Sequence, residues 1–266
     1  MSDKKKEKEK VGEEGPREPR FPSLFANKQA LKQAIRTYIR TDGVNCPHGP
    51  IGMWDVSNIT DMSFLFQDCR TFDEPLDGWD VSNVVNMASM FSDCLRFNQP
   101  LQMWNVSNVT NMSNMFSGCI HFNQPLDGWD VSHVTNMSTM FFGCFAFDQP
   151  LETWDVSNVV NMLLMFYKCY AFNQPLETWN VSHVRTMESM FYDCTAFNQP
   201  LADWDISNNT NITHMFVKCT SFDHNLFAWT YKNPLVYAYI QTNLLFSTAD
   251  QHQRCMEPVL LDYLLK

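Results

Sequence analysis

The sequence lacks the features from which a location or a metal site is most often inferred. No apolar run approaches the roughly 18 residues of a membrane span, so no transmembrane segment is expected. The charged N-terminal residues lack an adjoining apolar region, so no signal peptide is expected either. No Cys-x-x-Cys pair occurs, and Cys46 with His48 has no second pair at zinc spacing. The chain is therefore predicted to hold no metal.

Catalytic patterns are missing as well. The chain has no glycine-rich loop, and no histidine stands in a pattern with a serine or cysteine nucleophile and a carboxylate. These absences predict a protein that is not an enzyme and has no cofactor. Positive charge is scarce, because 19 Lys and Arg oppose 29 Asp and Glu, for a net charge of −10. An acidic body disfavours nucleic acid as a partner.

Residues 1–24 are predicted to form a disordered, charged tail. The first 20 residues carry seven Lys or Arg, six Asp or Glu and no aromatic side chain. Such a segment cannot bury enough apolar surface to fold. Its basic run, Lys4 to Lys10, has two interpretations: a solvated tail, or a contact for an acidic surface or nucleic acid.

One 25-residue unit fills most of the chain. Tryptophan recurs every 25 residues without insertion, at Trp54, Trp79, Trp104, Trp129, Trp154, Trp179, Trp204 and Trp229. A strict period in this range is typical of a solenoid, in which each unit buries its apolar face only against its neighbours. Seven stacked coils are therefore predicted over residues 51–230, at about 4.8 Å per coil.

Within a coil, the apolar residues predict a short helix or 3₁₀ turn. Val109, Met112, Met115, Phe116 and Cys119 are separated by steps of 3, 3, 1 and 3, which is one helical face. Proline follows in the Gln-Pro-Leu segment, so a strand is expected near Trp-Asp-Val instead.

Seven of the nine cysteines also follow the period, from Cys69 to Cys219. Neighbouring side chains about 4.8 Å apart lie near the long edge of disulfide geometry, so buried, free thiols are predicted rather than disulfides. Free thiols are typical of a reducing compartment.

Both ends of the repeats have the pattern of a cap. Residues 25–50 are predicted to be a capping helix and loop, because 27–41 carry an amphipathic stripe with Asn27 as N-cap and Gly43 as stop. Residues 231–266 are predicted to cap the other end. The apolar segment 258–266 either packs on that cap or anchors a partner.

The motif "WDVSNVTNMSxMFxxCxxFNQPL" resembles the BspA-like leucine-rich repeat family, in the 25-residue branch that is common in mycoplasma lipoproteins and also present in protists and large DNA viruses. The resemblance covers residues 51–230, and "FANKQALKQAIRTYIRTDG" (25–43) is similar to the helix that often precedes the first repeat there. The resemblance implies an α/β solenoid, a right-handed leucine-rich-repeat-like stack with short strands on one side and short helices on the other. It also implies recognition or adhesion, with no catalytic residues.

Candidate binding residues lie at the positions that vary between repeats. Counting from each tryptophan, these are offsets 9, 10, 13 and 16. Aromatic and leucine side chains gather there in the middle repeats, and they are Phe142, Phe145, Tyr167, Tyr170, Tyr192, Leu163 and Leu164. A row of such residues either forms an exposed interface or packs between the helices of neighbouring coils.

These observations predict a non-catalytic solenoid that binds a protein partner, inside the cell or on a particle. The first alternative is a structural or cement component of a virus particle or another large assembly. The second alternative is a surface adhesin.

Overall fold

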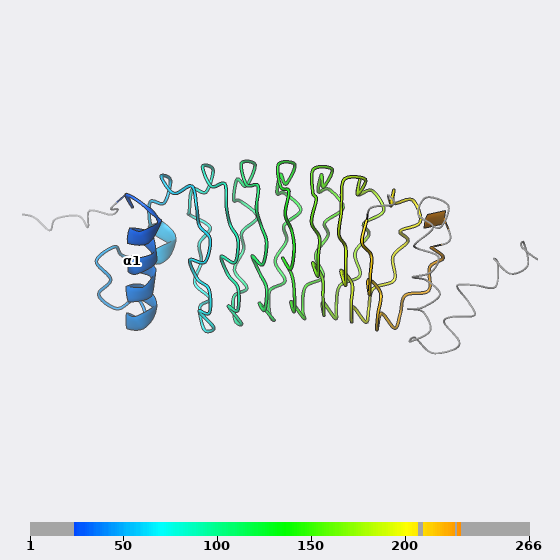
Figure 1. The fold of residues 1–266 in the computed structure, drawn as a ribbon. Helices are drawn as coiled ribbons and strands as arrows, with labels where there is room; N and C mark the ends of the chain where they lie inside the picture. The colour runs from blue at the N-terminus through cyan, green and yellow to red at the C-terminus, as the bar shows by residue number, and fades with distance from the viewer. Residues whose placement is uncertain (1–23, 207–209, 227, 230–266) are drawn as a thin grey trace, which may run out of the picture.

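The computed structural model describes residues 24–206, 210–226 and 228–229. A helix lies at one end, and successive repeats lie side by side from there along a single axis (Figure 1). The predicted tail 1–24, except Leu24, and the predicted cap 231–266 with its segment 258–266 lie outside the described residues. Within the described part of the chain, no helix has the length and apolar character needed to cross a membrane.

Helix α1, Lys28–Thr41, covers the first repeat. The side chain of Asn27 accepts a hydrogen bond from the backbone N–H of Ala30, which caps the helix as the sequence pattern predicts. The helix ends at Thr41, and Asp42 caps it with a left-handed φ of 51°, one residue before the predicted stop Gly43. Leu31, Ala34 and Ile35 are buried against the first repeat. A 3₁₀ turn, η1, follows at Ile51–Met53.

The repeats contain turns where the sequence pattern predicts short helices. Every described repeat has left-handed backbone at offsets 10 and 14, and in the second repeat these residues are Ser89 and Asp93. Left-handed residues interrupt a right-handed helix. The backbone N–H groups of Met87, Ser89, Phe91 and Asp93 donate instead to carbonyls of the next repeat, over 2.6–2.9 Å. The local 3.6-residue pattern therefore records which side chains face inward, and does not indicate a helix.

The expected strand near Trp-Asp-Val is also absent from the described repeats. Isolated parallel bridges join successive repeats at offset 7, for example Asn86 to Asn111 and Asn111 to Asn136. The backbone N–H groups that donate to the next repeat follow directly, at offsets 8, 10, 12 and 14. Backbone pairing between repeats is therefore concentrated at offsets 7 to 14. Proline correctly argued against a strand in the Gln-Pro-Leu segment. No sequence feature showed that the paired residue would be at offset 7 instead of in the Trp-Asp-Val segment.

The interior consists of side chains that stack on their own copies in the next repeat. Phe116 and Phe141 are stacked with centroids 5.8 Å apart, and Phe122 and Phe147 with centroids 6.0 Å apart. Tryptophan forms a third column, in which Trp129 and Trp154 lie 6.5 Å apart. Because each ring packs on a ring of the same type, the period of the sequence becomes the period of the core.

Each tryptophan from Trp79 to Trp229 also links two repeats by a hydrogen bond, whereas Trp54 donates to the nearby carbonyl of Gly49. The indole Nε1–H of Trp129 donates to the carbonyl of Leu101, which lies 28 residues earlier, at 3.0 Å. The same carbonyl accepts the backbone N–H of Trp104 in its own repeat, also at 3.0 Å. A carbonyl oxygen has two lone pairs, and both are used here. Phenylalanine lacks this donor, which explains a tryptophan at this offset in every repeat.

Cysteine makes the second link of this kind. The thiol of Cys144 donates to the carbonyl of Phe116, 28 residues earlier, at 3.0 Å. Cys94, Cys119, Cys144, Cys169, Cys194 and Cys219 are free and buried, so the predicted ladder of buried thiols is confirmed for these six. Burial raises the pKa of each of these thiols, and that of Cys219 reaches about 12. Cys69 is only half-buried, because α1 precedes it instead of another repeat.

A third link uses the Asn-Gln pair before the proline. The side-chain oxygen of Asn123 accepts the backbone N–H of Asp148 and the amide of Gln149, both at 2.9 Å. Equivalent bonds join the other repeats, for example Asp148 to Asn173. These contacts satisfy backbone groups in a turn that proline prevents from pairing.

We predict that Trp129→Phe destabilises the protein by about 2–3 kcal/mol, from one lost hydrogen bond and the lost apolar contact. Chemical denaturation followed by circular dichroism measures the change. Phe147→Leu is the control, because it removes apolar volume at a buried position without removing a donor. A smaller loss for Trp129→Phe than for Phe147→Leu would contradict the role of the indole N–H.

We also predict that a thiol reagent leaves the six buried cysteines unmodified in the native protein. Their raised pKa keeps the thiolate fraction negligible near pH 8, whereas Cys46 and Cys69 are only half-buried. Mass spectrometry after labelling with and without denaturant counts the modified thiols. Fast native labelling at Cys119 or Cys144 would show that the ladder opens readily.

Candidate interaction surface

The candidate residues lie where each repeat turns its side chains outward. In the repeat that begins at Trp129, offsets 12 and 15 are Phe141 and Cys144, and both are fully buried. Offset 13, Phe142, is half-buried, and offset 16, Phe145, is 40% exposed. Inward and outward positions therefore alternate within a single turn, so variation at offsets 13 and 16 leaves the interior unchanged.

Three of the predicted rings form a continuous ladder at offset 13. Phe142 and Tyr167 are stacked with centroids 4.7 Å apart and planes 3° apart. Tyr167 and Tyr192 continue the stack at 4.8 Å and 14°. This spacing is shorter than that of the buried ring columns and close to the ~4.8 Å between paired strands. The rings of the ladder therefore lie almost directly above one another.

A second, shorter row lies beside the ladder at offset 16. Phe145 and Tyr170 are in contact, with centroids 4.9 Å apart and planes tilted by 33°. The structure thus brings together all five predicted rings in two rows. Leu163 and Leu164 are half-buried at offsets 9 and 10, and Leu164 has a left-handed φ of 55°. Leu164 adjoins the ladder, because its carbonyl accepts the backbone N–H of Tyr167 at 3.2 Å.

The rings are not part of the interior. The partly buried apolar residues that pack against the core of the described chain are Tyr38, Ile39, Cys46, Cys69, Phe216 and Leu226, and none of the five rings is among them. The described repeats have turns rather than helices at these offsets, and the rings stack on one another between the turns of neighbouring repeats. Earlier repeats use Ser92 and Ser117 at the ladder offset, so the fold does not require a ring there.

Two lysines complete the ladder. The Nζ of Lys168 lies 5.6 Å from the centroid of the Tyr167 ring, and Lys218 lies 5.6 Å from that of Tyr192. Both lysines stand at the left-handed offset 14, which projects the side chain beside the neighbouring ring. A cation over the face of a tyrosine is attracted by the ring. The ladder is therefore an aromatic surface with positive charge beside it.

Sequence reasoning did not include the cations of α1 in the site. Lys28, Lys32, Arg36 and Arg40 recur every four residues on a helix with no acidic residue, and this spacing was the available signal. The Nζ of Lys28 binds Asp61 at 2.9 Å and Ser63 at 2.6 Å. Lys28, Lys32 and Arg36, named here the basic flank, therefore lie on the side of α1 that faces the variable offsets of the first repeat.

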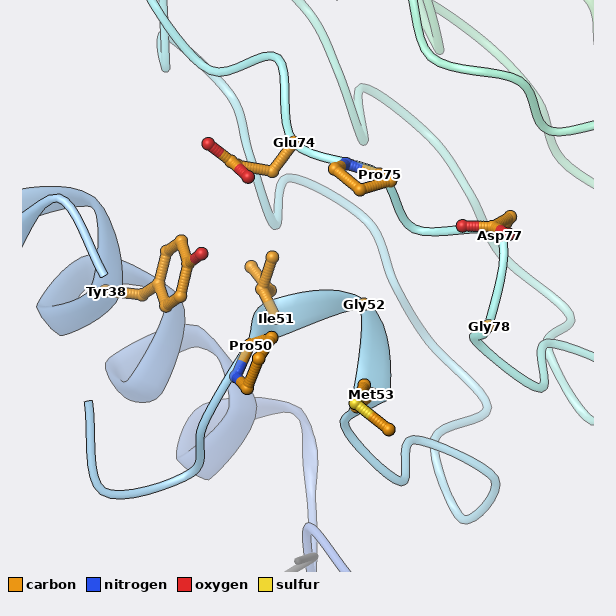
Figure 2. Close-up of a pocket in the computed structure, with 9 residues that line it drawn as sticks. All are labelled: Tyr38, Pro50, Ile51, Gly52, Met53, Glu74, Pro75, Asp77 and Gly78. Atoms are coloured by element: carbon orange, nitrogen blue, oxygen red, sulfur yellow. The ribbon is translucent and has the colours of Figure 1, made fainter. Parts of the chain in front are cut away.

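A cavity of about 310 Å³ lies between α1, η1 and the first repeat (Figure 2). Ile51 and Met53 give it an apolar wall, and the carboxylates of Glu74 and Asp77 line the opposite side. Burial, and next the charge of Glu74, raise the pKa of Tyr38 in its wall. This lining favours a cationic group over an anionic one. The cavity has no nucleophile paired with a base.

Glycine is required beside this cavity, because the chain segments approach closely there. A Cβ on Gly52 would lie 2.6 Å from the carbonyl oxygen of Pro75, and a Cβ on Gly78 would lie 2.5 Å from that of Gly52. Among the described residues, no group of three His, Cys, Asp or Glu side chains is placed to hold a metal ion.

The comparison with protein families identifies the repeat. The family described as "Mycoplasma protein of unknown function, DUF285" matches residues 23–153 and again residues 135–254. The chain belongs to the DUF285 family. Because the first match begins at residue 23, the DUF285 unit includes α1 together with the tandem repeats. Neither the curated proteins nor the solved structures gave a significant match to this chain.

Proposed function

We propose that this DUF285 protein is a non-catalytic scaffold that binds a protein partner through the variable positions of its repeats. We further propose that its stack is a right-handed, leucine-rich-repeat-like solenoid of the BspA-like type. The tandem repeat supports this assignment, together with the hydrogen bonds that each repeat makes to the next. Such an array offers an extended surface on one rigid body.

The observation that carries the proposal is the ladder of Phe142, Tyr167 and Tyr192. Three stacked rings lie outside the core, at an offset where other repeats use serine. Tyrosine and phenylalanine supply large contact area at low entropic cost and are enriched at interfaces. Five aromatic side chains that lie in two rows outside the core are best explained by a partner that covers them.

We predict that the triple variant Phe142→Ser, Tyr167→Ser and Tyr192→Ser folds but loses its partner. Two ring contacts disappear, each worth about 0.2–1 kcal/mol, so the loss of stability stays below about 2 kcal/mol. Immobilised protein captures partners from its native source, and mass spectrometry quantifies them. We expect the partner captured by the parent protein to decrease about tenfold, which corresponds to about 1.4 kcal/mol.

The matched control changes three exposed apolar residues outside the ladder. Val85, Met103 and Val160 are 44%, 78% and 37% exposed, and each is replaced by serine. This variant is expected to capture the partner as the parent does. Unfolding of the ladder variant would place the rings in the core, and undiminished capture by a folded ladder variant would rule out the ladder as the interface.

A further inference from the structure

Charge is divided between two sides of the repeats. Residues 51–229 contain 19 carboxylates and five cations. Exposed carboxylates line the tryptophan edge, within two residues of a tryptophan, and they are Asp77, Asp80, Asp127, Asp130, Glu152, Asp155, Glu177, Asp203 and Asp205. No lysine or arginine occupies these offsets. One side of the stack therefore carries negative charge beside most of its tryptophans, whereas the positions beside Trp104 are Gln102, Met103 and Asn105.

The cations of the repeats lie half a repeat away from that edge. Lys168 and Lys218 are at offset 14, Arg70 is at offset 16 and Arg96 at offset 17. Only Arg185, at offset 6, stands elsewhere. Half a 25-residue coil separates the tryptophan from offsets 12 to 13, so the cations lie across the coil from the carboxylates. They share a side with the aromatic ladder.

The basic flank of α1 adjoins this same side. Lys28 binds Asp61 and Ser63 and lies 5.8 Å from the centroid of Phe64, at offset 10 of the first repeat. The charges of Lys32 and Arg36 both act on the thiol of Cys69, at offset 15. Burial, then Arg36 and Lys28, lower the pKa of Lys32, so these cations are crowded together. A positive segment thus lies at one end of the variable side, and an aromatic segment lies in the middle.

We propose that the partner contributes an extended acidic peptide segment, which lies along the variable side with carboxylates at the basic flank and aromatic side chains at the ladder. This proposal rests on the proposed function and specifies its partner. Charge complementarity selects carboxylates at α1, and the fixed stack of rings selects aromatic or apolar groups in the middle repeats. Arg70 and Arg96 lie between the two segments and continue the positive charge.

A single peptide strand fits better than a nucleic acid or a membrane. Asp68, Asp93 and Asp193 stand at offset 14 among the cations, and the tryptophan edge has carboxylates but no lysine or arginine. A polyphosphate backbone or an anionic lipid surface carries negative charge along its whole extent and would be repelled by these carboxylates. A peptide can place its few carboxylates at the basic flank alone. From the first to the sixth repeat is about 24 Å, which roughly seven extended residues span, so a peptide of roughly 12 residues covers this distance with about five residues left to contact α1.

The test uses a fluorescein-labelled 12-residue peptide with four glutamates in one half and three tyrosines in the other, and a second peptide with the halves exchanged. Fluorescence anisotropy measures binding to the full chain at about 50 and 300 mM salt. We expect one of the two orders to bind, with weaker binding at high salt. A peptide with lysine in place of glutamate is expected not to bind.

The variant Lys32→Glu with Arg36→Glu is expected to weaken binding about tenfold and to reduce the salt dependence. Arg185→Glu is the matched control, because it reverses an exposed cation at offset 6, and it is expected to leave binding unchanged. If the variant with both charges reversed does not fold, the neutral variant Lys32→Gln with Arg36→Gln replaces it in the binding measurement. Circular dichroism establishes the fold of each variant.

Several results would overturn the proposal. They are no binding of either acidic peptide, equal binding of the lysine peptide, an unchanged affinity in the folded flank variant, or tighter binding of an oligonucleotide or anionic vesicles. The capture experiment with the native source distinguishes a failure of the acidic-peptide proposal from a failure of the proposed protein-binding function. If the flank variant still captures the partner and the ladder variant does not, the protein-binding function stands and the acidic segment is wrong.

Discussion

The structure depends on carbonyl groups that accept two hydrogen bonds, one from their own repeat and one from the next. The carbonyl of Leu101 accepts the backbone N–H of Trp104 and the indole of Trp129, and the carbonyl of Phe116 accepts the backbone N–H of Cys119 and the thiol of Cys144. The indole and the thiol each donate to a carbonyl 28 residues earlier in the chain. An inserted residue would move both donors out of reach, which explains why the repeats admit no change in length.

This constraint restricts where the sequence is free to vary. The inward offsets carry stacked rings and donors, so their side chains are the same in nearly every repeat. Offsets 13 and 16 project outward beside left-handed residues and accept polar, aliphatic and aromatic side chains. Aromatic variation is therefore found at outward offsets, where it leaves the interior unchanged. At those offsets the repeat geometry aligns any aromatic residues into a ladder.

The same geometry separates charge. Carboxylates recur beside most of the tryptophans, so small sequence preferences become an acidic edge on the stack. The cations of α1 join the opposite, variable side because Lys28 binds Asp61. This ion pair holds the Asp61 pKa below its usual value, although burial alone would raise it. The helix that covers the first repeat thereby also extends the candidate interaction surface.

The sequence by itself determined the period, the helix at residues 28–41, the buried cysteine ladder and the five rings of the candidate surface. It did so because a period aligns equivalent side chains whatever the backbone between them. Only the tertiary structure decided the backbone of the repeat, since the left-handed conformation of Ser89 or Leu164 has no sequence signal and the bonds that hold it come from the next repeat. It also decided that the basic flank joins the variable side, because that placement depends on contacts between residues 33 and 35 positions apart.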